Sequence, residues 1–157
     1  MVRRGRENAS IALGVNAMTP TQRVLLRQTF ESMVPLPRRF GLQFYDRLFE
    51  LDPSLRALFR GDPERQATML LNALTLAVLR LLDDGRASKA VHDLGARHRD
   101  YGVLDGHYAT FGEALLWTFE QRLGDGFSPE LRGAWSEAWS EIALAMQQAA
   151  AGGAPAS

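Results

Sequence analysis

Apolar residues recur at spacings of three and four along most of the chain between residues 19 and 149, and no stretch shows sustained alternation of apolar and polar positions. The first pattern is typical of helices with one buried face, and the second would be expected of half-buried strands. The chain is therefore predicted to be one all-α domain, 19–149, of about seven helices, with a flexible arm at 1–18 and a disordered tail at 150–157.

Start and stop signals place the individual helices. Thr19-Pro20-Thr21-Gln22 offers an N-cap, a proline at the first helical position and a capping-box glutamine, and Ser128-Pro129-Glu130 begins the last helix in a similar way. Two central helices are short, one at 54–58 and one that bears His98 and ends before Gly102, and a corner separates the third helix from a long fourth one at 63–83. Helices of such mixed length favour crossed packing around a pocket over a regular bundle.

Composition limits the partners. Lys plus Arg and Asp plus Glu balance at 18 each, so no strongly basic surface is expected for a nucleic acid. We infer a small or neutral ligand. The chain has no cysteine, which excludes disulfides, thiolate zinc sites and iron–sulfur clusters.

No segment indicates export or membrane insertion. Three arginines stand near the start, but residues 9–17 are too weakly apolar for a secretory signal. The most apolar run, 69–82, contains three polar residues and is shorter than a bilayer requires, which favours a buried helix. We expect a cytoplasmic protein with no membrane partner, whose start at Met1 or Met18 stays open.

His98 is the candidate metal ligand. On a helix it shares one face with Leu94 and Tyr101, so its imidazole is expected to point toward the core. A buried imidazole needs hydrogen bonds or a metal, and these residues alone leave both alternatives open. No carboxylate shares this inward face to complete a ligand set, and His92 and His107 are expected at the surface.

Two polar side chains lie on otherwise apolar faces. Tyr45 shares a face with Phe49, and Gln66 stands one turn before Leu70 on the long helix. Tyr45 is either a core tyrosine bonded to a backbone carbonyl or a ligand contact, and Gln66 is either a half-exposed first-turn residue or a ligand contact. In the last helix, Trp135 and Met146 belong to the apolar stripe.

The ordered set of segments resembles the globin family, in particular the single-domain bacterial globins related to the globin half of flavohaemoglobins. The resemblance covers about residues 19–149. It is carried by Phe44–Phe49, Pro53–Phe59, Gln66 with Leu70, Leu94-Gly95-x-x-His98-x-x-Tyr101-Gly102-Val103, Tyr108 and Trp135.

The resemblance implies a globin fold around haem b, held without covalent bonds because the chain lacks cysteine. It implies that His98 is the proximal ligand of the iron, on one side of the haem, with Leu94 and Val103 beside the ring. Phe59 would stack on the haem, and Tyr108 would contact the haem or His98 from below.

On the opposite, distal side, the resemblance places Tyr45 and Gln66 at the polar positions and Leu70 at an aliphatic one. Gln66 stands where this family commonly has histidine, so the sixth iron position is expected to be open or weakly held, and whether Tyr45 reaches ferric iron stays open. Donors from Tyr45 and Gln66 would slow the release of oxygen. Slow release argues against bulk oxygen delivery.

The expected activity is high-affinity binding of oxygen, nitric oxide or other small ligands, with nitric oxide oxidation to nitrate through an external reductase as one outcome. The flavohaemoglobins that the chain resembles pair a late glutamate with the tyrosine that Tyr108 matches, but Met146–Ala150 has no carboxylate, which weakens a peroxidase-like role. The alternatives are a haem-based gas sensor acting through a partner protein and a haem-free helical interaction module.

Overall fold

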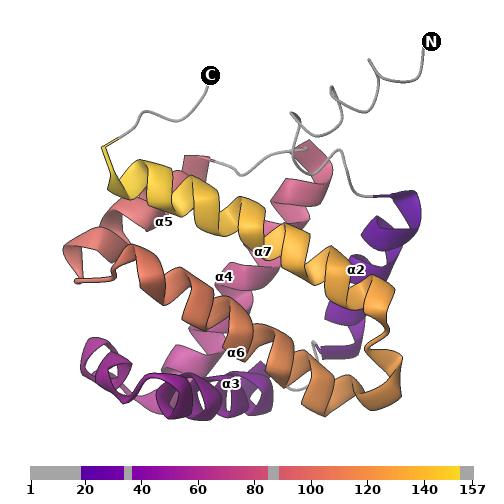
Figure 1. Cartoon of the computed structure of the whole chain (residues 1–157), viewed down its shortest axis with the longest axis horizontal. Helices are drawn as coiled ribbons and strands as arrows, with labels where there is room; N and C mark the ends of the chain where they lie inside the picture. Colours follow the sequence, from indigo (N-terminus) through magenta and orange to yellow (C-terminus); the bar gives the residue numbers. More distant parts are fainter. Residues whose placement is uncertain (1–18, 34–36, 85–88, 153–157) are drawn as a thin grey trace.

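The computed structural model describes residues 19–33, 37–84 and 89–152, which form an all-helical fold without a strand in those ranges (Figure 1). The helices are α2 (Pro20–Met33), α3 (Pro37–Leu51), η2 (Pro53–Leu58), α4 (Pro63–Asp84), α5 (Lys89–Asp100), α6 (Asp105–Leu123), η3 (Gly124–Gly126) and α7 (Pro129–Ala150). All seven expected helices are present, and η3 is an additional single turn. The predicted arm and residues 153–157 of the predicted tail lie outside the described residues.

Local signals begin the helices where the sequence predicts. At α2, the Thr19 N–H donates to Gln22 Oε1 at 3.0 Å and the Gln22 N–H donates to Thr19 Oγ1 at 3.1 Å, which completes the capping box. At α7, Ser128 Oγ accepts from the Leu131 N–H at 3.1 Å. The short third helix, which Asp52 caps, is a 3₁₀ helix.

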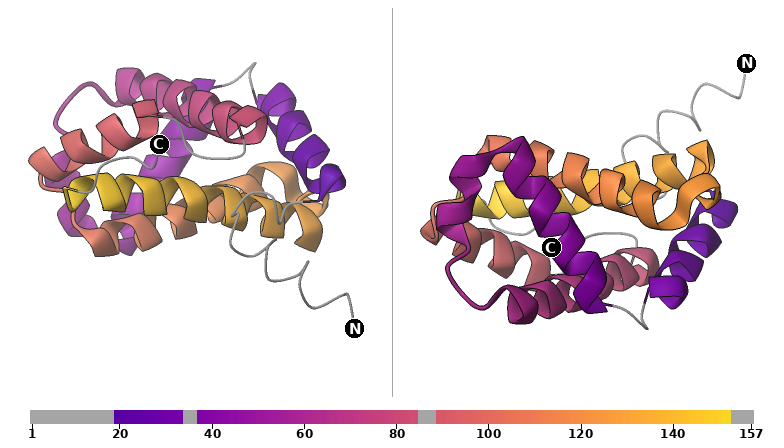
Figure 2. Two further views of the ribbon diagram at one scale, coloured as in Figure 1. Left: turned by 90° about the horizontal axis from the view of Figure 1, so that it is seen from above. Right: turned by 90° about the horizontal axis from the view of Figure 1, so that it is seen from below.

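The helices cross rather than run parallel. Figure 2 shows α4 and α5 on one side of the molecule, with α6 and α7 on the other. At the crossing of α3 and α4, a Cβ placed on Gly41 would lie 2.4 Å from the Cβ of Ala67. The two backbones therefore meet directly, and only small residues fit at this point.

An aromatic core fills one half of the domain. Trp135 is fully buried, stacks on Phe119 with ring centroids 4.2 Å apart and meets Phe30 edge-on at 5.2 Å. Trp135, which carries part of the family resemblance, is thus a core residue. The other half of the domain contains a cavity.

By length and composition alone, α4 could cross a membrane over Pro63–Asp83, a test that core helices also pass. In this fold, the buried face of α4 packs against α3 and also lines the cavity. The predicted role of 69–82 as a core helix agrees with that packing, although Met69, which borders the cavity, and Leu76 are exposed.

Candidate functional site

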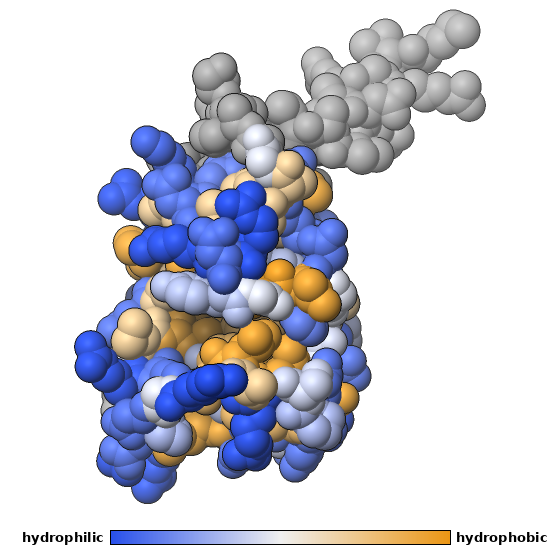
Figure 3. Space-filling model, turned by 90° about the vertical axis from the view of Figure 1, so that its left-hand side faces the viewer, coloured by the Kyte–Doolittle hydropathy of each residue, from blue (hydrophilic) through white to orange (hydrophobic). Residues whose placement is uncertain are grey.

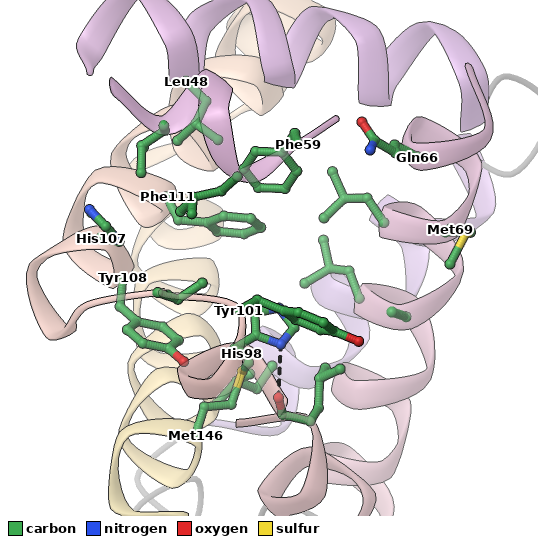
Figure 4. A pocket seen from close by; sticks show the side chains of 18 of the residues that line it. Leu48, Phe59, Gln66, Met69, His98, Tyr101, His107, Tyr108, Phe111 and Met146 are labelled. Carbon is green, nitrogen blue, oxygen red and sulfur yellow. Dashed lines mark hydrogen bonds between the residues drawn. The ribbon is translucent and has the colours of Figure 1, made fainter. Parts of the chain in front are cut away.

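A cavity of about 410 Å³ lies between α3, η2, α4, α5, α6 and α7. Figure 3 shows its apolar opening on one face of the molecule, and Figure 4 shows its walls. Most of the lining side chains are aliphatic or aromatic. The structure brings all eight predicted site residues to this one cavity: Tyr45, Phe59, Gln66, Leu70, Leu94, His98, Val103 and Tyr108.

His98 lies in the last turn of α5 with one ring nitrogen already used. Its Nδ1 is 2.8 Å from the carbonyl oxygen of Leu94, and because a carbonyl only accepts, Nδ1 carries the proton and donates. Nε2 therefore keeps its lone pair, and the His98 side chain lines the cavity (Figure 4). This is the tautomer that presents Nε2 to a metal.

Burial also keeps the His98 imidazole neutral. Desolvation lowers its pKa below the ordinary value of 6.5; the Leu94 carbonyl opposes this shift and the charge of Arg97 adds to it. At pH 7 the imidazole is therefore uncharged, as ligation of a metal requires.

Across the cavity, Tyr45 and Gln66 supply polar donors on the wall formed by α3 and α4. Burial raises the pKa of the Tyr45 phenol to about 12, so it keeps its proton at physiological pH. Neither side chain makes a hydrogen bond to another described residue. Within the described part of the chain, Tyr45 therefore has no bond to a backbone carbonyl, which was the alternative that the sequence left open.

Aromatic and aliphatic residues fill the wall between these two polar regions. Phe59, at the end of η2, lies 5.1 Å from Tyr45 and 5.8 Å from Phe49 between ring centroids. Leu70 on α4, Leu94 on α5 and Val103 after α5 are half-buried and border the cavity.

Tyr108 adds a buried phenol near His98. The residue is only 6 % exposed, and its hydroxyl has no hydrogen-bond partner among the described residues. Burial, followed by the negative charge of Asp105, raises its pKa, so the O–H stays neutral. Figure 4 shows Tyr108 with the Met146 side chain close by on the His98 side of the cavity.

Tyr101 lines the cavity beside His98, as their shared helical face predicts, with ring centroids 6.5 Å apart. It is nevertheless 70 % exposed at the cavity mouth, where α5 ends at Asp100 and Gly102 takes a φ of 96°. The expectation that His107 lies at the surface was wrong. His107 is half-buried and lines the cavity. Its Nδ1 accepts the Leu104 N–H at 2.9 Å, which caps the start of α6.

The globin family model matches residues 42–146, about two thirds of the chain, and this range includes every one of the eight predicted site residues. The chain belongs to the globin family.

The sequence is also similar to individual proteins. Anaerobic nitrite reductase AHB2 of Arabidopsis thaliana is 26 % identical over 150 residues, which cover 86 % of this chain and 95 % of that protein. The flavohemoprotein of Bacillus subtilis is 31 % identical over 123 residues, which cover 74 % of this chain but only 31 % of that protein. This globin chain therefore matches less than a third of the flavohemoprotein's length.

A solved structure shows the same fold. The flavohemoglobin from Malassezia yamatoensis, whose crystal contains bound FAD and heme, superposes with a TM-score of 0.74 at 16 % identity, over 85 % of this chain and 37 % of that one. The predicted all-α globin fold is thus confirmed.

The residues present in the cavity fit haem. A flat apolar macrocycle needs an apolar cavity, and its iron needs a nitrogen ligand, which Nε2 of His98 would be able to supply. The described residues contain no group of three His, Cys, Asp or Glu side chains placed to hold a bare metal ion. The donor set therefore suits a porphyrin-bound iron better than a free ion.

Sequence reasoning missed Trp139 as a cavity residue. Its N–H donates to the Tyr108 carbonyl oxygen at 3.0 Å, and its ring stacks on Phe111 with centroids 4.6 Å apart. Gly112 leaves room for the indole, since a Cβ there would lie 2.6 Å from it. Helical spacing shows that Trp139 faces inward, but it gives no means to distinguish a cavity wall from a filled core.

Proposed function

We propose that this globin binds haem b without covalent bonds, with His98 as the axial ligand, and holds oxygen or another small diatomic ligand with high affinity. One observation carries the proposal. His98 presents a free Nε2 to an apolar cavity, opposite two polar side chains, Tyr45 and Gln66, that have no partner among the described residues. Haem iron, when bound, supplies an open coordination position for a gas.

The chain's own residues would control how the gas is held. The Leu94 carbonyl orients the His98 ring, and the apolar lining limits water. Tyr45 keeps its proton because of its raised pKa, and the Gln66 amide carries two N–H groups. Two donors directed at a ligand that gains negative charge slow its release. Such slow release suits ligand chemistry better than bulk oxygen delivery.

Oxidation of nitric oxide to nitrate is the redox activity that we propose, with electrons from a separate reductase. Support comes from the likeness to a flavohemoprotein, of which this chain matches only part. No Asp or Glu is among the described residues that line the cavity, which favours gas chemistry over cleavage of peroxide. We further propose a cytoplasmic location, without a nucleic-acid or membrane partner.

The first test is the absorption spectrum of the purified full chain, reconstituted with hemin, in the ferric, ferrous and ferrous carbon monoxide states. We expect a histidine-ligated haem in the wild type and its loss in His98→Ala. The matched control is His92→Ala, on the same helix but outside the cavity lining, which should keep the spectrum. A wild-type chain that holds no haem would instead indicate a helical interaction module.

A haem-loaded chain that binds gases could still be a sensor. Its gas-bound and gas-free forms would then differ in affinity for a partner protein, whereas a dioxygenase consumes nitric oxide when a reductase and oxygen are supplied. Nitric oxide consumption that depends on His98 supports the proposal, and no consumption under these conditions contradicts it.

A further inference from the structure

Gln66 lies in the first turn of α4, next to the corner between η2 and α4. Its N–H donates to the carbonyl oxygen of Asp62 at 3.0 Å, and α4 begins at Pro63. Asp62 is therefore the N-cap, Gly61 the residue before the cap and Gln66 the fourth residue of the helix. At the start of many helices, a hydrophobic side chain just before the cap packs on a hydrophobic side chain at the fourth helical position. Gly61 and Gln66 occupy these two positions.

Here one member of that pair has no side chain. A Cβ placed on Gly61 would lie 2.9 Å from Nε2 and 3.6 Å from Cδ of Gln66, so the Gln66 amide occupies the space that a side chain would take. The backbone itself does not require glycine, because the described glycines with positive φ are Gly102, Gly124 and Gly152. The contact with Gln66 is thus the feature that depends on Gly61.

No other described group holds the amide in place by a hydrogen bond. Figure 4 shows Gln66 at the rim of the cavity, on the side away from His98. Backbone at the corner borders the amide on one side and open cavity borders it on the other. A side chain at residue 61 would therefore force the amide to leave this place.

We propose that Gly61 is a positioning residue for Gln66: its bare backbone gives the Gln66 amide a resting place at the rim and so limits how far the amide extends into the space above His98. Gly61 thereby sets how closely the amide approaches a ligand in the cavity. This inference rests on the proposed function only where a gas ligand is used to measure it, because the contact between Gly61 and Gln66 exists in the protein without haem.

The test compares Gly61→Ala, Gln66→Leu and the double variant in the ferrous carbon monoxide state. In Gly61→Ala, we expect a lower C–O stretching frequency, because an N–H donor moves toward the ligand, and carbon monoxide association slower by about threefold or more. In the Gln66→Leu background, the same glycine substitution should change neither quantity. Gly106→Ala is the matched control, since nothing lies within 4 Å of a Cβ at that position.

Nuclear magnetic resonance provides a readout that needs no gas ligand. The side-chain amide signals of Gln66, identified by their loss in Gln66→Leu, should show nuclear Overhauser contacts to the α protons of Gly61 in the full chain, and Gly61→Ala should shift them. Unfolding by urea should be nearly unchanged in Gly61→Ala, because the displaced atoms are the end of a flexible side chain.

Several results would overturn the inference: no such contact in the wild type, no effect of Gly61→Ala, a raised stretching frequency, or an equal effect when Gln66 is absent. Failure of the proposed function has a different signature, namely a chain that forms no carbon monoxide complex at all. In that case the contact between the Gln66 amide and Gly61 is still measured by nuclear magnetic resonance. The absence of this contact would then contradict the positioning role of Gly61.

Discussion

The backbone of Gly95 on α5 lies directly against the backbone of Met146 on α7. A Cβ placed on Gly95 would lie 2.3 Å from the Met146 carbonyl oxygen and 2.5 Å from its Cα. Both atoms belong to backbone and have little freedom to move. Because His98 follows Gly95 by less than one turn, this contact sets how far the imidazole reaches into the cavity.

Gly95→Ala should therefore both destabilise the protein and impair the site. Overpacking at a backbone contact costs about 1–3 kcal/mol, measured here as the free energy of unfolding in urea. Haem affinity should fall as well, because α5 must move away from α7. Gly133→Ala is the control: a Cβ there meets nothing within 4 Å, so alanine in that helix should stabilise by about 0.5–1 kcal/mol. Equal effects of the two substitutions would contradict the role of Gly95.

Removal of the Tyr45 hydroxyl should speed oxygen release. If the phenol donates to the ligand, Tyr45→Phe should raise the oxygen dissociation rate of the ferrous protein about tenfold or more, since charge-assisted hydrogen bonds contribute about 1.5–3 kcal/mol. Stopped-flow measurement of oxygen release gives the rate directly. An unchanged rate would show that Tyr45 plays no distal role.

Tyr45 should also make the fold sensitive to alkali. The folded pKa is about 12, against 10.0 for an ordinary tyrosine, so between these values the unfolded chain has lost a proton that the folded chain retains. The free energy of unfolding should then fall as pH rises through this window, by up to about 1.4 kcal/mol per pH unit from this group. Urea unfolding from pH 9 to 12 should show a shallower decline in Tyr45→Phe. Parallel curves for the two proteins would argue against a buried, neutral phenol.

Tyr108→Phe should not weaken the haem-free protein. An unpaired buried hydroxyl costs about 1–3 kcal/mol, and this substitution removes it while keeping the ring. We expect the free energy of unfolding to be unchanged or to rise by about 1 kcal/mol. Tyr101→Phe, at an exposed site, serves as the control with an effect within about 0.5 kcal/mol. A marked loss of stability in Tyr108→Phe would reveal a hydrogen-bond partner such as ordered water.

The starts of the helices were the most predictable part of the fold. The capping box of Thr19 and Gln22 and the cap at Ser128 follow from short-range hydrogen bonds, and the structure has them where the sequence indicates. His98 was predictable as an inward-facing residue because it lies within a regular helix. The resemblance then added Tyr45 and Gln66, which spacing alone left undecided.

What the sequence concealed depends on the ends of helices and on distant contacts. Helical spacing put Tyr101 on the face of His98, but α5 ends one residue before Tyr101, and spacing does not show that this side chain is 70 % exposed at the cavity mouth. His107 was expected at the surface, and its spacing gave no sign that its side chain would accept the Leu104 N–H at the start of α6. Nothing in the local pattern shows that Gly95 will meet Met146 from another helix.

The direct meeting of Gly41 and Ala67 bears on how gases would be discriminated. Gly41 is one turn before Tyr45 on α3, and Ala67 adjoins Gln66 on α4. The spacing between the helical segments that carry the two distal side chains is thus set by the backbone of Gly41 against the backbone and the single methyl group of Ala67, with no longer side chain between them. Selectivity among small ligands would accordingly depend on the residue types at positions 45 and 66 rather than on side chains packed between the two helices at this crossing.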